Sequence, residues 1–203
     1  MAEKIPVAEG AFVVPDVLMP DECAAYIALS EKIGYEPATI TTAVGAELRP
    51  DVRNNDRVIH DDPSLAATLW QLVGDYLPDR VGERKVLGLN ERFRFYRYDP
   101  GQRFEWHMDG YFERENGERS LYTMLFFLND SFEDGETRFR VRDAEGIKTV
   151  GVKPVTGQAL IFLHEMLHEG AAVTAGRKYI LRTDVMYSAS ANARSRGWRD
   201  RQR

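Results

Sequence analysis

The sequence predicts a mostly β fold with N-terminal helices, an antiparallel barrel or jelly roll in which the helices cover one sheet from outside. From about residue 86 onward, short apolar or alternating runs recur between turn signals such as Pro-Gly, Asn-Asp and Asp-Gly. Helical periodicity is confined to the N-terminal third, so no helices alternate with these strands. The 203 residues, 43% hydrophobic and 29% charged, suit one globular domain with a sizeable core.

Two helices are expected in the N-terminal third. The first begins at Pro20, where a missing N–H costs nothing, and ends at Gly34. The second is capped by Asp62 and closed by Pro78. The apolar stripes expected to face the sheet are Cys23, Tyr26, Ile27 and Ile33 on the first helix, and Leu65, Leu69, Leu72, Val73 and Tyr76 on the second.

Between the helices, residues 35–61 are polar and predict a strand followed by an irregular loop, with residues 53–57 placed to border a site. Eight strands are expected after the second helix. They lie near 86–98, 103–108, 119–129, 136–142, 147–153, 157–163, 168–173 and 177–187.

The first long strand has two different faces. Phe93 and Phe95 fall on one face and suit packing under the helices, whereas Arg94, Tyr96 and Tyr98 fall on the other. Because buried cations need partners, the second face is expected to line a lumen that holds an anionic ligand. A polar face turned to solvent is the alternative.

His107 and Asp109 are two residues apart, so on a strand they would point to the same face. A second imidazole, His168, comes from a later strand. Together they would form a 2-His-1-carboxylate facial triad, which leaves three positions of an octahedral metal open. An H-x-D pair alone is a weak signal, but here it follows a Tyr-Asp-Pro-Gly turn at 98–101.

The segment from about Asn90 to Tyr187 resembles the catalytic domain of the prolyl-4-hydroxylase-like 2-oxoglutarate/iron(II) dioxygenases. The matching pieces, in the family's order and spacing, are YDPG and HMDG, GETRF at 135–139, PVTGQALIF at 154–162 and HEG with GRKY at 168–179. The resemblance implies a double-stranded β-helix (jelly roll) with helices packed on the major sheet. It also implies Fe(II), 2-oxoglutarate as co-substrate and O2, with ascorbate as an optional addition.

Carried over by position, the resemblance makes His107, Asp109 and His168 the iron ligands. Lys178, ten residues after the second histidine, matches the residue that pairs with the distal carboxylate of 2-oxoglutarate, and Tyr98 matches a tyrosine of the co-substrate pocket. Two positions depart from the family. Asp134-Gly135 stands where Gly-Gly is common, and Phe127 stands where some members have a tyrosine that reaches the co-substrate.

Arg182 competes with Lys178 for the co-substrate. It lies four residues further along the same strand face, near the offset at which other branches of the superfamily place an arginine. A guanidinium grips a carboxylate with two parallel hydrogen bonds, which an ammonium does not. At least one of the two is expected to bind 2-oxoglutarate, with Lys178 favoured by the motif.

Residues 164–168 spell His-Glu-Met-Leu-His, the HExxH signature of zinc metalloproteases. That chemistry requires a helix and a third ligand. The upstream Leu160-Ile161-Phe162 is typical of a strand, and only Asp184 remains downstream as a ligand. This is the third alternative, behind a non-catalytic cupin-like barrel that binds a metal or a small ligand.

The resemblance divides the single expected domain, residues 1–203, into a helical or irregular part (1–85), a catalytic β-helix core (86–187) and a short basic tail (188–203). The expected activity is hydroxylation of a C–H bond in a peptide, protein or small molecule, with release of succinate and CO2. Weak candidates for substrate contact are Arg94, Tyr96, Tyr111, Arg114 and the 53–57 loop.

The composition and the net charge restrict the binding partners and the cellular location that can be expected. A net charge of -5 argues against broad nucleic-acid binding, and the five arginines between 194 and 203 suit a solvated tail. Single Cys23 excludes an intrachain disulfide, and no apolar run approaches a membrane span or a signal peptide. A cytoplasmic protein without nucleic-acid or membrane partners is expected, and its oligomeric state is not readable.

Overall fold

The computed structural model describes residues 3–42, 45–144 and 146–190, so the predicted arginine cluster at 194–203 lies outside the described residues. Two α-helices and a 3-10 turn occur among many short strands. The elements are β1 (Ile5–Ala8), β2 (Ala11–Val14), α1 (Pro20–Ile33), β3 (Glu36–Pro37), β4 (Ile40–Thr42), β5 (Gly45–Glu47), β6 (Asp56–Asp61), α2 (Pro63–Val73), η1 (Gly74–Tyr76), β7 (Arg80–Val81), β8 (Arg84–Leu89), β9 (Arg92–Tyr98), β10 (Phe104–His107), β11 (Arg119–Phe127), β12 (Phe132–Asp134), β13 (Thr137–Asp143), β14 (Gly146–Val152), β15 (Ala159–Leu163), β16 (His168–Gly170), β17 (Val173–Gly176) and β18 (Lys178–Tyr187).

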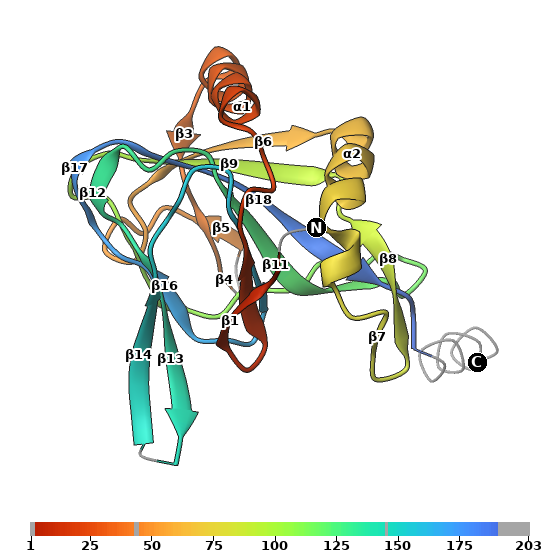
Figure 1. Cartoon of the computed structure of the whole chain (residues 1–203). Coiled ribbons are helices and arrows are strands. Elements are labelled where there is room, and N and C mark those ends of the chain that lie inside the picture. Colours follow the sequence, from red (N-terminus) through yellow and green to blue (C-terminus); the bar gives the residue numbers. More distant parts are fainter. Residues whose placement is uncertain (1–2, 43–44, 145, 191–203) are drawn as a thin grey trace.

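Two sheets form the framework of the molecule. The major sheet follows the order β1-β2-β15-β11-β18-β9-β6-β3, with β8 also paired to β18, and the minor sheet follows β10-β16-β13-β14. Neighbouring strands in both sheets run antiparallel. Figure 1 shows α1 and α2 on one side of the major sheet and the minor sheet on the other. The predicted double-stranded β-helix with helices on its major sheet is therefore confirmed.

The helices begin and end where the sequence indicated. Asp62 caps α2 by accepting the Leu65 N–H at 2.9 Å, and Gly34 ends α1 with its N–H on the Ser30 carbonyl. Cys23 and Leu69 are buried against the outer face of the major sheet. Burial of such side chains is the main favourable term that holds the helices in place.

Strand β9 separates the two layers as predicted. Phe93 and Phe95 belong to the cluster beneath the helices, whereas Tyr96 and Tyr98 belong to the second cluster, between the two sheets. This second cluster also contains Phe139 of the minor sheet. The interior between the sheets is therefore the lumen in which the polar face of β9 lies.

Several predicted elements differ from the structure. The run 86–98 is two strands, β8 and β9, which pair with successive stretches of β18. Strands β1, β2 and β6 extend the major sheet at its edges, although the part before residue 86 was expected to be helical or irregular. Ile33 and Leu72, predicted to face the sheet, are exposed by 46% and 42%. The division at residue 85 stays a prediction.

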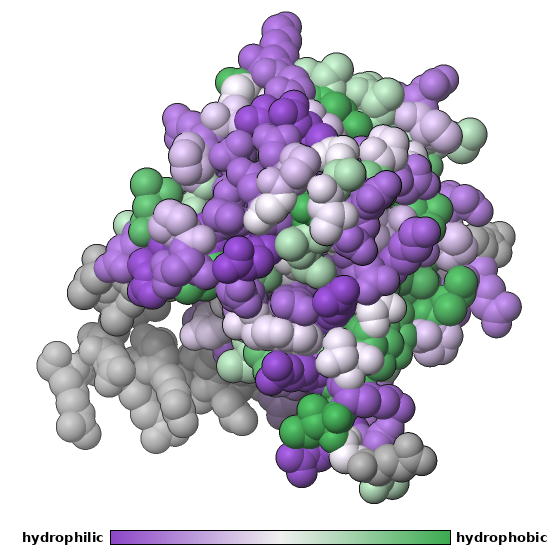
Figure 2. Space-filling model, turned by 90° about the vertical axis from the view of Figure 1, so that its left-hand side faces the viewer, coloured by the Kyte–Doolittle hydropathy of each residue, from purple (hydrophilic) through white to green (hydrophobic). Residues whose placement is uncertain are grey.

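The surface is mostly polar on the face drawn in Figure 2, where apolar side chains are scattered in small groups. The β13–β14 hairpin projects away from the body of the molecule (Figure 1). Within the described ranges, neither helix has the length and hydropathy needed to cross a bilayer.

Candidate active site

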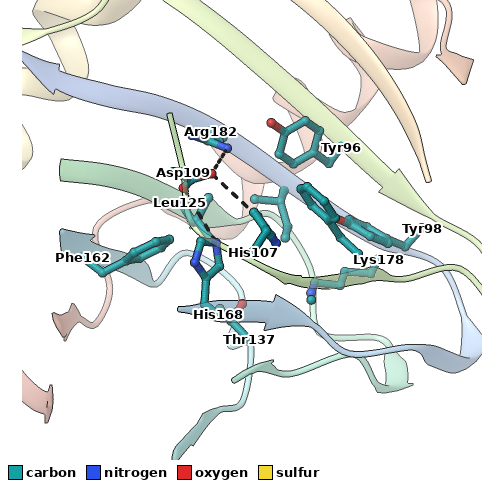
Figure 3. A pocket seen from close by; sticks show the side chains of 13 residues that line it. Tyr96, Tyr98, His107, Asp109, Leu125, Thr137, Phe162, His168, Lys178 and Arg182 are labelled. Atoms are coloured by element: carbon teal, nitrogen blue, oxygen red, sulfur yellow. Dashed lines mark ion pairs between the residues drawn. The ribbon is translucent and has the colours of Figure 1, made fainter. Parts of the chain in front are cut away.

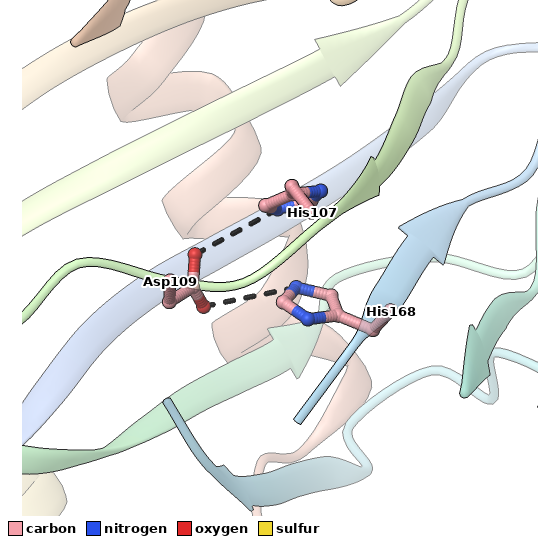
Figure 4. A group of neighbouring side chains, drawn as sticks. All are labelled: His107, Asp109 and His168. Carbon is pink, nitrogen blue, oxygen red and sulfur yellow. Dashed lines mark ion pairs between the residues drawn. The ribbon is translucent and has the colours of Figure 1, made fainter. Parts of the chain in front are cut away.

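Three potential metal ligands meet in the minor sheet. His107, the last residue of β10, and His168, the first of β16, are cross-strand partners whose ring centroids lie 4.2 Å apart. Asp109 is two residues beyond the end of β10, on a loop that its N–H ties to the His164 carbonyl at 2.9 Å. The ligand atoms of the three residues lie within 4.8 Å of one another (Figure 4). The convergence is as predicted, although Asp109 is placed by a loop and not by the strand.

Backbone carbonyls orient both imidazoles. Nδ1 of His107 lies 2.7 Å from the Glu105 carbonyl, and Nδ1 of His168 lies 2.9 Å from the Met166 carbonyl. These oxygens can accept only from a protonated Nδ1, which leaves each Nε2 free to bind a metal. Both Nε2 atoms face Asp109, each 3.7 Å from one of its carboxylate oxygens.

Burial sets the charge of the two histidines. Desolvation, with a smaller effect of the neighbouring His168, lowers the pKa of His107 to about 3 although Asp109 opposes the shift. Desolvation also lowers the pKa of His168. Both imidazoles are therefore neutral at physiological pH, which is the form that binds a metal.

Asp109 is kept ionised in a buried position. Burial would raise the pKa of its carboxyl, but Arg182 and the two histidines outweigh this and hold it well below its usual range. Oδ1 accepts from Nη1 of Arg182 at 2.8 Å, and Oδ2 accepts from the Thr123 hydroxyl at 2.6 Å. Two neutral imidazoles and one carboxylate fit a divalent first-row metal with open coordination positions.

A pocket lies beside this cluster, and its wall includes both cationic residues predicted for the co-substrate. Figure 3 shows Arg182 beside Asp109 and Lys178 beside Tyr98, at the other end of the pocket. The other lining residues are Tyr96, Phe104, His107, Leu125, Thr137, Phe162, His168, Gly170 and Ile180.

Lys178 is a buried cation without an anionic partner among the residues that the structure describes. Its side chain is 1% exposed, and its Nζ donates to the Gly135 carbonyl at 2.5 Å and lies 5.2 Å from the centre of the Tyr98 ring. Desolvation lowers the pKa of this ammonium to about 7. An unpaired buried ammonium is costly, so this end of the pocket suits a carboxylate ligand.

Arg182 is paired where Lys178 is not. Besides Asp109, its guanidinium contacts Asp184 at 3.4 Å. Burial would lower its pKa, but Asp109, Tyr96 and Asp184 outweigh this and raise it. Arg182 is therefore a permanent cation already bound to the candidate metal ligand.

Only some of the residues predicted to contact the substrate lie at or near the pocket. Tyr96 lines it, and Arg94 reaches Asp184 at 3.3 Å. Arg114 instead pairs with Glu91 and Glu118, and Tyr111 is 56% exposed with the Arg119 guanidinium 3.3 Å over its ring. Neither Tyr111 nor Arg114 lines the pocket.

Two further residues lie beside the site: Phe104, which was not singled out from the sequence, and Arg53, which belongs to the predicted 53–57 loop. Phe104 stacks on the His107 ring with centroids 3.5 Å apart, and the Arg53 guanidinium lies 4.5 Å from the rings of both Tyr96 and Phe104. The polar cluster 53–57 had marked a loop bordering a site, but no periodicity identified Arg53 as its buried member. Its position depends on an isolated bridge to Phe104.

The HExxH alternative is wrong. Residues 164–167 form a turn, and His168 begins a strand, so the two histidines do not share a helix face. The His164 ring lies at hydrogen-bond distance from the hydroxyls of Thr123 and Ser120, 2.9 Å and 2.8 Å away. His164 thus supports Thr123, which in turn binds Asp109.

Comparisons with known proteins agree with this geometry. Residues 93–183 match the model of the 2OG-Fe(II) oxygenase superfamily. Probable prolyl 4-hydroxylase 3 of Arabidopsis thaliana is 27% identical over 198 residues, which cover 83% of this chain and 66% of that protein. Against this and a second Arabidopsis prolyl 4-hydroxylase, the chain spans slightly less than two thirds of the relative's length.

Two solved structures share the fold. The viral collagen prolyl hydroxylase of Paramecium Bursaria Chlorella virus-1, in a 2OG complex, has a TM-score of 0.62 and 19% identity, covering 89% of this chain and 97% of that one. A Trichoplax adhaerens prolyl hydroxylase, in complex with a hypoxia inducible factor peptide fragment, has a TM-score of 0.67 and 15% identity, covering 87% and 83%. Together with the sequence relatives, they confirm the predicted resemblance to prolyl-4-hydroxylase-like oxygenases.

Proposed function

From the match of its core to the 2OG-Fe(II) oxygenase superfamily, we propose that this chain is an Fe(II)- and 2-oxoglutarate-dependent dioxygenase. It hydroxylates a C–H bond of a peptide, a protein or a small molecule. One atom of O2 enters the new hydroxyl group and the other enters succinate, while 2-oxoglutarate loses CO2. The observation that supports this best is a buried His-Asp-His cluster sharing one pocket with an unpaired buried lysine.

In this proposal His107, Asp109 and His168 hold the metal, which activates O2 when bound. Lys178 binds the distal carboxylate of 2-oxoglutarate, and Tyr98 forms the wall beside it. The pocket has a volume of about 30 Å³, so some of the side chains that line it must move to admit 2-oxoglutarate. In the proposal the Lys178 ammonium exchanges its hydrogen bond to the Gly135 carbonyl for one to the distal carboxylate.

Arg182 acts as a positioning residue for Asp109 in this scheme. Its contact to Oδ1 and the Thr123 contact to Oδ2 hold the carboxylate from both sides. A carboxylate held in this way is oriented before the metal arrives, as outer-shell partners commonly do. Lys178, which lacks such a partner, is the better candidate for the co-substrate.

The alternative of a cupin-like barrel without turnover predicts bound metal but no affinity for 2-oxoglutarate. It leaves unexplained why Lys178 is buried in the metal pocket without an anion, at a cost to folding. Arg182 faces the same pocket, which also disfavours this alternative.

A reducing compartment such as the cytoplasm suits the proposed enzyme, because the metal must stay in the iron(II) state. Cys23 is a buried free thiol, which is compatible with such a compartment. Ascorbate, as an optional reductant, would serve the same purpose.

The proposal is tested by succinate release from 2-oxoglutarate in the presence of Fe(II) and O2. The wild-type protein is expected to turn over slowly without substrate, and His107→Ala is expected to lose this activity. Lys178→Met should raise the KM for 2-oxoglutarate about tenfold or more, since it removes a charge-assisted contact. Arg182→Met should instead weaken metal binding. Equal succinate release by wild type and His107→Ala would overturn the ligand assignment.

A further inference from the structure

We propose that the substrate presents a carboxylate to an arginine cluster at the end of the pocket opposite Lys178. The cluster consists of Arg53, Arg57, Arg94 and Arg182. The substrate class is thus a small free carboxylic acid, such as an amino acid, and not a prolyl residue inside a peptide. The inference depends on the proposed function, which it extends to the substrate.

Strand register places the cluster on the inner face of the major sheet. Arg57 of β6 is the cross-strand partner of Tyr96, and Arg94 of β9 is the partner of Arg182. Cross-strand partners project from the same face, and Tyr96 and Arg182 both line the pocket. Arg57 and Arg94 therefore project from the pocket side of the sheet, beyond the residues that line the pocket, and both are partly exposed there.

The two ends of the pocket are separate. Lys178 and Arg182 lie four residues apart on β18, which corresponds to roughly 13 Å along a strand. Lys178 is paired in register with Tyr98, and Arg182 with Arg94. A molecule held by the Lys178 ammonium thus leaves the arginine end free for a second ligand, with the candidate metal ligand Asp109 beside Arg182.

Positive charge is in excess at the arginine end. The four guanidinium groups share two carboxylates, since Arg94 pairs with Asp184 and Arg182 pairs with both Asp184 and Asp109. Burial would raise the pKa of the Tyr96 phenol, yet Arg182, Arg53 and Arg94 outweigh this and lower it. A divalent metal at Asp109 would increase the excess further.

Two of the four arginines have no carboxylate partner in the described part of the chain. Arg57 donates to the Thr39 hydroxyl at 3.1 Å, and Arg53 donates to the Asn55 side chain at 2.7 Å. Arg53 is 5% exposed, and its Nη2 is buried without a hydrogen-bond partner. Unpaired guanidinium groups at a pocket edge fit a carboxylate from outside, because buried cations that keep no partner are costly.

Arg57 is the cluster member best suited to a test. Arg53 is packed between two rings, and Arg94 and Arg182 neutralise Asp184, so their removal would disturb the fold. Arg57 is half-buried, and among residues 3–42, 45–144 and 146–190 it forms no ion pair that its removal would break. Arg142, exposed on the projecting β13–β14 hairpin, is the matched control.

The experiment measures thermal stability of the full chain loaded with Mn(II) and 2-oxoglutarate without oxygen, so that binding is read without turnover. The probes are free L-amino acids and short-chain carboxylic acids, each tested beside its primary amide. At least one acid is expected to raise the melting temperature while its amide does not. Arg57→Gln should weaken binding of that acid about tenfold and Arg57→Lys less than that, because lysine keeps the charge but not the paired hydrogen bonds, whereas Arg142→Gln should bind it as wild type does.

The outcomes separate the two levels of the proposal. A protein that 2-oxoglutarate itself does not stabilise would contradict the proposed function and the inference together. A protein stabilised by 2-oxoglutarate, but by no acid of the panel, or by acids and amides alike, would contradict the inference alone. So would an Arg57→Gln variant that binds the acid as tightly as Arg142→Gln.

Discussion

Lys178 is a residue whose proposed role in ligand binding comes at a cost in stability. Its ammonium is buried against Tyr98 and Phe127, and its hydrogen bond goes to a backbone carbonyl. An isolated buried cation is among the costliest groups that a core can contain. Such a residue is expected to be stabilised only when the proposed carboxylate ligand arrives.

The first prediction concerns this cost. Lys178→Met should stabilise the ligand-free protein by at least about 1 kcal/mol, because the variant removes an uncompensated charge while keeping the volume. Chemical denaturation measures the change, and the same variant should lose affinity for 2-oxoglutarate. A variant that is less stable and still binds 2-oxoglutarate normally would contradict the role given to Lys178.

The same group predicts a pH dependence of stability. The folded-state pKa of Lys178, about 7, is lower than its ordinary value of 10.5. Between these values the unfolded chain binds more protons, so this group makes stability rise with pH across that window. The rise should be smaller in Lys178→Met and smaller when 2-oxoglutarate is bound. Equal slopes of stability against pH in the wild type and in Lys178→Met would contradict this assignment to Lys178.

The histidines predict how metal binding depends on pH. The pKa of His107 is lowered to about 3, and that of His168 is also lowered, so protons compete with the metal for these imidazoles less than for ordinary ones. Mn(II) affinity should therefore change little between pH 7 and pH 5. An imidazole with an ordinary pKa would weaken binding about thirtyfold over that range. Calorimetric titration at the two pH values measures the difference, and a fall of that size would contradict the buried geometry.

The individual site residues that the sequence predicted are those that belong to local motifs. His107, Asp109, His168 and Lys178 were predicted by spacing and by resemblance, and the structure brings all four to one pocket. Arg53 was predicted only as part of the 53–57 loop, and its burial was not, because that depends on contacts with Tyr96 and Phe104, more than forty residues away in the chain. Contacts of that range leave no periodic signal in the sequence.

Strands β9 and β6 differ in how clearly the sequence predicts them. The alternation in β9 predicted both its faces, because one meets the helices and the other the lumen. Strand β6 pairs with β9 but was expected to be partly loop. Its inner face carries Arg57, Ile59 and Asp61, and Val58 is the only apolar residue of its outer face, so the apolar alternation that marks a strand is missing.

Gly157 gives a prediction for the turn before β15. Its φ is +82°, and an added Cβ would lie 2.1 Å from the Leu18 carbonyl, which is backbone and cannot move aside. Gly157→Ala should lower the free energy of unfolding by about 3 kcal/mol. The control is Gly101→Ala, where φ is +84° and nothing lies within 4 Å, so only about 1 kcal/mol of backbone strain is expected. Equal losses of stability in Gly157→Ala and Gly101→Ala would contradict the predicted steric clash.

At the scale of the whole molecule, both sheets contribute to the site. The two histidines come from the minor sheet and Lys178 from the major sheet, so a metal with 2-oxoglutarate would join the two layers. The fold class and the helix positions followed from the order of strand and turn signals. Strands β1 and β2, at one end of the major sheet, did not, because four-residue strands are too short for an alternating pattern.

This arrangement predicts that binding of the metal and of 2-oxoglutarate stabilises the folded protein. Mn(II) and 2-oxoglutarate together, each at a hundred times its dissociation constant, should stabilise the native state by more than about 2.7 kcal/mol, the value for one such ligand. Thermal unfolding measures the shift, with His107→Ala as the control. A shift of the same size in His107→Ala would mean that the ligands bind elsewhere.

A crystal structure with Mn(II) and 2-oxoglutarate tests the central claim most directly. The account predicts one ion bound by His107, Asp109 and His168, with 2-oxoglutarate on its open side. The distal carboxylate should lie within hydrogen-bond distance of the Lys178 ammonium. An ion held by other residues, or a 2-oxoglutarate whose distal carboxylate lies away from Lys178, would contradict the account.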